Sequence, residues 1–243
     1  MKMKVLQFVA VLFLILPIIG NAQEVISEGI ITMELTDVDS EDQQMAAQLE
    51  MMKGTETNYY FNDAKYLSTS NMMGGMVKMQ NLFNVSDESM ILLFDVMGQK
   101  MLVESSKEER KEMEAEQMEA LEGIEVVYDK EDTKEIMGYN CHKATIVTDQ
   151  GEIQMKLNMY ITPEVKASNK MIQGLQGFKI DGFPMELVMD MGTMSMTYTT
   201  TEISKELDSS IFDLETSGYK KMTLDEFQAV SYTHLTLPTT PYV

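Results

Sequence analysis

The sequence predicts a mainly β protein of the α+β class, in which one large curved antiparallel sheet carries two or three helices on its concave side. The first observation is a series of ten short segments rich in β-branched, aromatic or alternating apolar residues. The second is that short breaks separate these segments, which favours antiparallel neighbours over parallel strands with long crossovers. The third is a length of 243 residues, which is enough for one sizeable hydrophobic core.

The expected strands follow one another along most of the chain. Residues 152–160 alternate between polar and apolar side chains, so this strand is expected to have one exposed face. Gly98 and Gly192 fall between expected strands and suit tight turns. The expected strands cover residues 25–38, 55–62, 76–85, 89–97, 99–104, 124–129, 141–148, 152–161, 185–191 and 193–204.

A first helix is expected over residues 40–53. Ser40 is a candidate N-cap, because a serine hydroxyl can accept a hydrogen bond from a free amide of the first turn. Met45, Leu49 and Met52 then recur at helical spacing and would form its apolar face.

Two further helices are expected in the second half of the chain. Residues 106–122 begin with Ser106 followed three positions later by Glu109, which is a capping-box pattern. A shorter helix is expected over residues 163–173, because Pro163 suits a first helical position.

The N-terminus has the layout of a secretory signal peptide over residues 1–22. Lys2 and Lys4 precede an almost unbroken apolar run, and small residues precede a predicted cut after Ala22. The run is shorter than the roughly 20 residues of a membrane-spanning helix. We therefore expect a periplasmic or secreted protein that is not integral to the membrane.

The mature chain is expected to form a single domain over residues 23–227. Residues 228–243 differ in kind, because they contain no Lys, Arg, Asp, Glu or Met, which are frequent elsewhere. Residues 230–238 also resemble translated sequencing-adapter read-through. The tail is therefore predicted to be non-native.

The charge balance excludes one class of partner. Without Lys2 and Lys4 the chain keeps 17 of its 19 basic residues against 39 acidic ones, a net charge of −22. A field of that sign repels nucleic acid and anionic lipid surfaces, so we predict no nucleic-acid partner. Cys141 is the only cysteine, so no internal disulfide can form.

Residues that carry chemistry are few, and we predict neither catalytic residues nor a cofactor. His142 and His234 are the only histidines, and no zinc-ligand or nucleotide-binding spacing occurs. Cys141 and His142 are neighbours in an expected strand, so their side chains should point to opposite faces. With 39 carboxylates in the chain, any particular pair is uninformative.

Methionine is the unusual feature, with 25 in the chain and 23 after loss of Met1 and Met3. Three interpretations stay open: an ordinary core, a surface that accepts variable apolar ligands, and a soft-metal site for Cu(I). The candidate groove residues are Met155, Leu157, Met159, Leu187, Met189, Met191, Met194 and Met196. The candidate soft-metal ligands, in the alternative, are Met72, Met73, Met76 and Met79.

Several segments of the second half resemble the exported bacterial family called domain of unknown function 4412 and its GLPGLI relatives. The resemblance covers about residues 124–227 and departs from the family pattern at Tyr160, which stands near the family's tryptophan, and before Gly218, where a proline is missing. The segments that carry it are residues 132–145 (similar to D-T-K-x-I-x-G-Y-x-C-x-K), 160–164 (similar to W-x-T-P-E), 182–187 (similar to G-x-P-x-x), 211–212 and 218–222 (similar to F-x-x-P-x-G-Y-K-K-M).

The resemblance implies a fold rather than a reaction. It implies a LolA/LolB-like half-barrel, whose concave side can hold lipoprotein acyl chains in that superfamily, and structural roles for Gly138 and Cys141. The sequence therefore predicts a non-catalytic envelope protein that binds an apolar or lipid ligand, such as an acyl chain, or another envelope protein. The alternatives are periplasmic copper binding by the methionine clusters and an uncharacterised enzyme.

Overall fold

The computed structural model describes residues 25–150, 153–227 and 229, and strands dominate them. The strands are β1 (Gly29–Ser40), β2 (Glu56–Phe61), β3 (Lys65–Met72), β4 (Val77–Asn84), β5 (Met90–Val96), β6 (Gln99–Ser105), β7 (Val127–Ile136), β8 (Tyr139–Gln150), β9 (Ile153–Thr162), β10 (Phe183–Asp190), β11 (Met194–Ser204) and β12 (Lys220–Met222). The helices are α1 (Gln43–Glu50) and α2 (Lys107–Ala120), and the 3-10 turns are η1 (Met73–Gly75), η2 (Asn169–Met171) and η3 (Ser209–Phe212).

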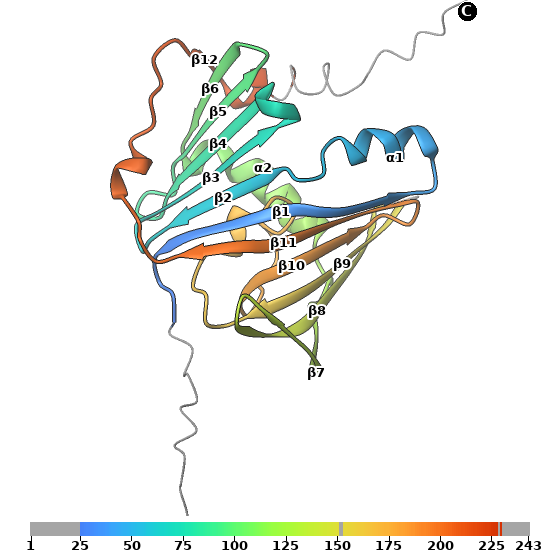
Figure 1. Cartoon of the computed structure of the whole chain (residues 1–243). Helices are drawn as coiled ribbons and strands as arrows, with labels where there is room; N and C mark the ends of the chain where they lie inside the picture. Colours follow the sequence, from blue (N-terminus) through green and yellow to red (C-terminus); the bar gives the residue numbers. More distant parts are fainter. Residues whose placement is uncertain (1–24, 151–152, 228, 230–243) are drawn as a thin grey trace, which may run out of the picture.

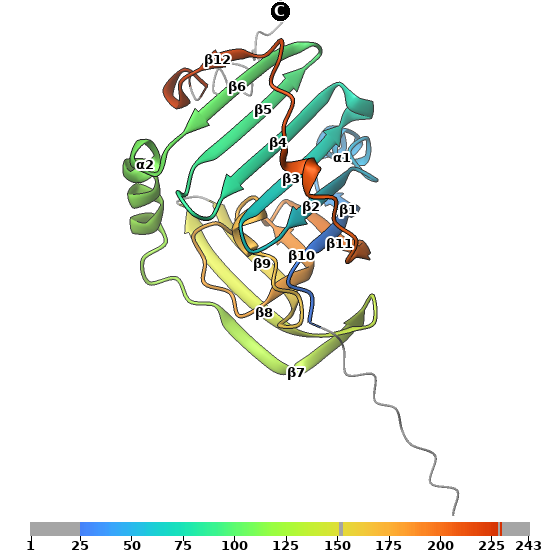
Figure 2. The ribbon, with the colours of Figure 1, turned by 90° about the vertical axis from the view of Figure 1, so that its left-hand side faces the viewer.

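All twelve strands belong to one sheet, in the order β12-β6-β5-β4-β3-β2-β1-β11-β10-β9-β8-β7. Two antiparallel meanders, β1–β6 and β7–β11, meet where β1 pairs with β11. The connection through α2 runs from β6, near one edge of the sheet, to β7 at the other (Figures 1 and 2). The predicted large, curved and essentially antiparallel sheet is therefore confirmed.

Three strands differ from the sequence prediction. β3 was not expected, because its sequence KYLSTSNM is mostly polar. β7 begins at Val127 and continues through a charged stretch to Ile136, beyond the expected end at residue 129. The short β12 was also unexpected, and it runs parallel to its neighbour β6. In each case pairing with neighbouring strands, rather than apolar periodicity, forms the strand.

The two predicted N-terminal helix signals had different outcomes. Ser106 and Glu109 form the predicted capping box: the Glu109 amide donates to Ser106 Oγ at 3.3 Å, and the Ser106 amide donates to Glu109 Oε2 at 2.7 Å. At α1 the predicted cap is wrong. Ser40 ends β1, and Asp42 caps the helix by accepting from the Met45 amide at 2.8 Å.

The predicted helix over residues 163–173 is also wrong. This segment belongs to a loop over residues 163–182, the plug loop, whose only helical element is η2. Asn169 holds the loop in shape, because its side-chain amide donates to the carbonyl oxygens of Leu175 at 3.1 Å and Phe178 at 3.0 Å. Those bonds bring the chain back on itself where a helix would have continued.

Two hydrophobic clusters lie on opposite faces of the sheet. The larger one joins the concave side chains of β8, β9 and β10 to the plug loop, which contributes Met171, Leu175 and Phe178. The smaller one is on the convex face, where Phe212 of η3 covers Leu67 and Leu82. None of the helices in the described residues is both long and apolar enough to cross a bilayer.

Candidate ligand-binding face

The concave surface of the sheet is packed in one half and open in the other. Over most of β8–β10 the inward side chains are buried, as Ala144, Met159 and Leu187 illustrate, because the plug loop lies on them. Over β3–β6 most inward apolar side chains stay partly exposed to solvent, although Val103 of β6 is buried. The partly exposed residues, which we name the open concave face, are Tyr66, Met72, Val77, Met79, Phe83, Met90, Leu92, Phe94, Val96 and Met101.

The strand register establishes that these side chains share one face. Residues directly opposite in an antiparallel pair project to the same side of the sheet. Met33, a member of the concave core, lies opposite Thr57, and the same row continues through Ser70 to Met79 and Phe94. The open concave face is therefore continuous with the packed core of the other half.

Two buried oxygen atoms lie in the floor of the open concave face. Ser70 Oγ on β3 and Asn81 Oδ1 on β4 are shielded from solvent and have no hydrogen-bond partner among the described residues. Both residues belong to the inward rows of their strands. An unpaired buried oxygen is costly, so these two atoms are places where a ligand hydroxyl or a water molecule would be stabilised.

Side chains from two other elements close the ends of this face. Arg110 of α2 is 4% exposed and lies over the Phe83 ring, with 5.6 Å from its guanidinium carbon to the ring centroid. After β12 the chain turns, and the Phe227 ring packs edge-on against Phe94 with 5.8 Å between centroids. Both contacts are with inward residues of the open concave face, so α2 and the residues after β12 limit its extent.

The predicted groove residues fall partly on the packed half. Leu157, Met159 and Leu187 are buried under the plug loop, and Met155 and Met189 pack against the same core while partly exposed. Met194 and Met196 begin β11 and are partly exposed, as is Met191 in the turn before it. Sequence periodicity does not reveal which part of an inward face the chain itself covers.

An open cavity of about 710 Å³ lies between the end of α2 and the plug loop. Its apolar lining includes Leu121, Ile124 and Phe178, and its size is within the range of small-molecule sites. Four carboxylates surround it with a single lysine, Lys179; they belong to Glu119, Glu122, Glu125 and Asp181. These carboxylates disfavour the binding of an anionic lipid headgroup in the cavity.

The four candidate soft-metal ligands all lie on one hairpin. Met72 ends β3, Met73 begins η1, Met76 follows it, and Met79 is on β4. Met73 and Met76 are exposed. In the described part of the chain, no group of three His, Cys, Asp or Glu side chains is arranged to hold a metal ion.

The side chains of Cys141 and His142 point away from each other, as predicted. Cys141 and His142 are successive residues of β8 and project to opposite faces. Burial, with a smaller contribution from the negative charge of Glu164, raises the pKa of the Cys141 thiol to about 12. His142 lies beside the Tyr128 ring at 6.1 Å between centroids. This pair is therefore not arranged for nucleophilic catalysis.

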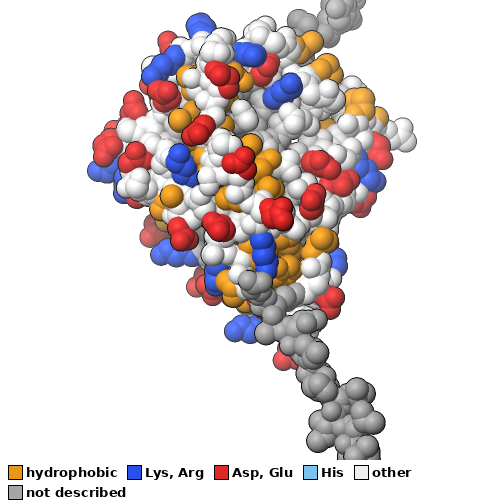
Figure 3. All heavy atoms as spheres, turned by 60° about the vertical axis from the view of Figure 1, so that its left-hand side comes forward, with side chains coloured by type: hydrophobic (Ala, Val, Ile, Leu, Met, Phe, Trp, Pro, Cys, Tyr) orange, Lys and Arg blue, Asp and Glu red, His pale blue; other side chains and the backbone are white. Residues whose placement is uncertain are grey.

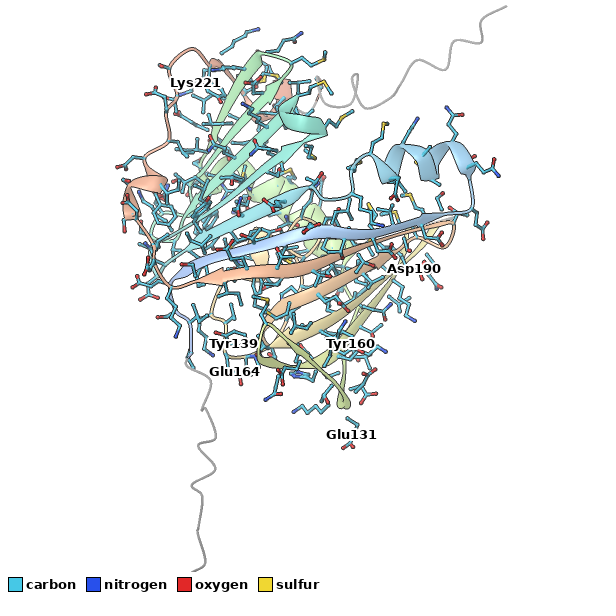
Figure 4. The ribbon with its side chains drawn as sticks, viewed as in Figure 1. Glu131, Tyr139, Tyr160, Glu164, Asp190 and Lys221 are labelled. Carbon is cyan, nitrogen blue, oxygen red and sulfur yellow. The ribbon has the colours of Figure 1, made fainter. Side chains whose placement is uncertain are left out.

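A polar network covers the outer face of β7–β10. Asp132 accepts from Lys143 Nζ at 2.9 Å and from the Tyr160 hydroxyl at 2.8 Å, and these hydrogen bonds lower the pKa of its carboxyl. Lys134 Nζ lies 2.6 Å from Glu186 Oε2 and over the ring of Tyr160. Figure 4 labels Tyr160 beside the lower strands of the sheet. The sequence segments that resemble the exported family supply all five residues, so those segments converge in space and form a structural contact on the convex side.

Gly182, which begins one of these segments, is also required for a structural reason. Gly182 has φ of +151°, and a Cβ atom there would lie 2.7 Å from the Thr162 carbonyl oxygen. Only glycine allows this close approach between the end of the plug loop and the end of β9.

Comparison with known proteins yields similarity of fold only. No protein-family model matches the chain, and no curated protein matches it. Among solved structures, the lipoprotein LppX of Mycobacterium tuberculosis is similar with a TM-score of 0.37 and 9% identity, over 74% of this chain and 89% of that one. LprF of Mycobacterium bovis is similar with a TM-score of 0.33 and 9% identity, over 74% of this chain and 88% of that one. A β-barrel-like protein of domain of unknown function 1849 from Brucella abortus is similar with a TM-score of 0.25 and 11% identity, over 74% of this chain and 98% of that one.

Proposed function

We propose that this protein is an exported, non-catalytic envelope protein that holds an apolar ligand, such as a lipid acyl chain, on its open concave face. The observation that carries the proposal is the contrast between the two halves of one concave surface. The same kind of inward apolar row is buried by the plug loop over β8–β10 and left partly exposed over β3–β6. A contiguous, partly exposed apolar surface favours an apolar partner.

The side chains around the open concave face favour a ligand whose bound part carries no charge. Arg110 is already paired with Glu114 at 2.9 Å and with the carbonyl oxygens of Ser105 and Ser106, so it does not offer a free positive charge to a carboxylate. The chain's net charge is −20. The unpaired atoms in its floor are the neutral oxygens of Ser70 and Asn81. An acyl chain carrying a hydroxyl or ester therefore fits better than a free fatty acid.

The absence of tryptophan from the chain allows a direct test. Leu92→Trp places a fluorophore in the middle of the open concave face, since Leu92 lies between Asn81 and Val103. A brominated acylglycerol should quench this fluorophore in a saturable way and shift its emission to the blue, and the brominated free fatty acid should do so more weakly. Bromine quenches only at close range, so quenching reports contact.

Met137→Trp provides the matched control. Met137 is exposed between β7 and β8, away from the open concave face, so its fluorophore should not be quenched. Equal quenching at both positions, or none at position 92, would contradict the proposal.

Soft-metal binding by Met72, Met73, Met76 and Met79 stays the alternative proposal, supported by their placement on one hairpin with two exposed. Titration with Cu(I) against a competing chelator distinguishes it, because replacement of all four by leucine should abolish uptake.

A further inference from the structure

Exposed methionines gather at one end of the half-barrel. The strand directions place α1, the β3–β4 turn and the β5–β6 turn at the end of the sheet where β1, β3 and β5 finish (Figure 1). The Met97 amide donates to the Met76 carbonyl oxygen at 2.8 Å, which ties two of these turns together. The exposed members, which we name the methionine rim, are Met45 (41%), Met51 (69%), Met73 (48%), Met76 (47%) and Met97 (77%).

The part of this end formed by β1 and α1 is strongly acidic, whereas the strands beside the β3–β4 and β5–β6 turns carry Lys78 and Lys100 with Asp95 between them. Residues 37–56, which include the end of β1 and all of α1, contain six carboxylates and one lysine. All six carboxylates are exposed; they are Asp37, Asp39, Glu41, Asp42, Glu50 and Glu56. Lys53 is itself paired, since its Nζ lies 3.5 Å from Asp37 Oδ1 and 3.7 Å from Glu50 Oε1. Figure 3 shows that acidic side chains also outnumber basic ones on another face of the molecule.

We propose that the methionine rim docks a cationic amphipathic polypeptide segment, with its apolar side on the methionines and its lysines or arginines on the carboxylates of β1 and α1. Methionine is unbranched and polarisable, so a surface built from it adapts to apolar side chains of different shapes. The carboxylates select a basic partner and repel anionic lipid and nucleic acid. The rim is distinct from the open concave face, so this inference does not depend on the proposed ligand.

The test measures binding of a fluorescently labelled 18-residue helical peptide of leucine and lysine to the purified protein by anisotropy. Saturable binding should weaken with added salt, because the charges are exposed. A peptide of the same composition in scrambled order, and a leucine–glutamate peptide of the same pattern, should bind at least tenfold more weakly. Equal binding of the scrambled peptide would overturn the proposal, since the amphipathic pattern would then be irrelevant.

The chain offers a closely matched pair of variants. Met73, Met97 and Met137 all have positive φ, at 53°, 54° and 52°, and all are exposed, but Met137 lies at the opposite end of the sheet. Asparagine tolerates this backbone conformation. Met73→Asn with Met97→Asn should weaken peptide binding at least tenfold, and Met137→Asn should leave it unchanged. Equal loss in both proteins, or loss in neither, would overturn the proposal.

A separate charge variant tests the second half of the interaction. Asp39→Asn with Glu41→Gln should reduce both the affinity for the peptide and its salt dependence. An unchanged salt dependence would contradict a role for these carboxylates. Acylglycerol quenching of the position-92 fluorophore should be the same in all rim variants, so failure of this inference and failure of the proposed function are distinguishable.

Discussion

Cys141 shows how one residue's surroundings determine its chemistry. Its side chain is 1% exposed, and burial raises the pKa of the thiol to about 12, so almost no thiolate exists at pH 8. Because Cys141 is the only cysteine, thiol reactivity reports on this site alone. We expect the native protein to be inert toward an aromatic disulfide reagent at pH 8, and one thiol per chain to react rapidly in concentrated urea.

The same experiment has an internal check. The rate of reaction in intermediate urea should follow the unfolding transition measured by circular dichroism, because only opening of β8 releases the thiol. Fast reaction of the folded protein would show that Cys141 is accessible and would return it to the set of functional candidates.

At the scale of elements, α2 depends on one side chain. Arg110 is the only arginine beside 18 lysines. Its guanidinium donates to the carbonyl oxygens of Ser105, Ser106 and Glu88, which join the start of α2 to β6 and to the turn before β5. A lysine has the same charge but a single nitrogen, so it cannot make these bonds together.

Arg110→Lys should therefore destabilise the protein by about 1–3 kcal/mol, since buried carbonyl groups would lose their partner. The free energy of unfolding from urea titration measures this loss. Lys111→Arg is the control, because residue 111 is exposed on the same turn of α2 and should change stability little. Equal stability of the two variants would show that α2 is held by other contacts.

Elements were predictable where local chemistry alone determines them. The capping box of Ser106 and Glu109 needs four consecutive residues, and it forms as predicted. β3 was missed because its polar residues become a strand only between β2 and β4. The helix expected after Pro163 failed because Asn169 makes hydrogen bonds six and nine residues further along, which no helical periodicity reports.

For the whole molecule, the curved antiparallel sheet and its inward methionines followed from the sequence, but the position of the candidate site did not. An inward row on β9 and an inward row on β4 look alike as patterns of alternating residues. Their difference comes from the plug loop, which covers the first row and not the second. Such tertiary coverage leaves no periodic signal, so the site could only be located from the arrangement of the elements in space.

The difference between the two halves leads to a last prediction, which compares the truncation of one methionine in each half of the concave surface. Met159 is 0% exposed beneath the plug loop, so Met159→Ala should leave a cavity and cost about 2–5 kcal/mol of unfolding free energy. Met79 lies on the open concave face and is already partly hydrated, so Met79→Ala should cost less than about 1 kcal/mol. Urea titration of both variants measures the difference. Equal losses would mean that the β3–β6 half is as tightly covered as the other, and an apolar ligand would then have no exposed surface to occupy.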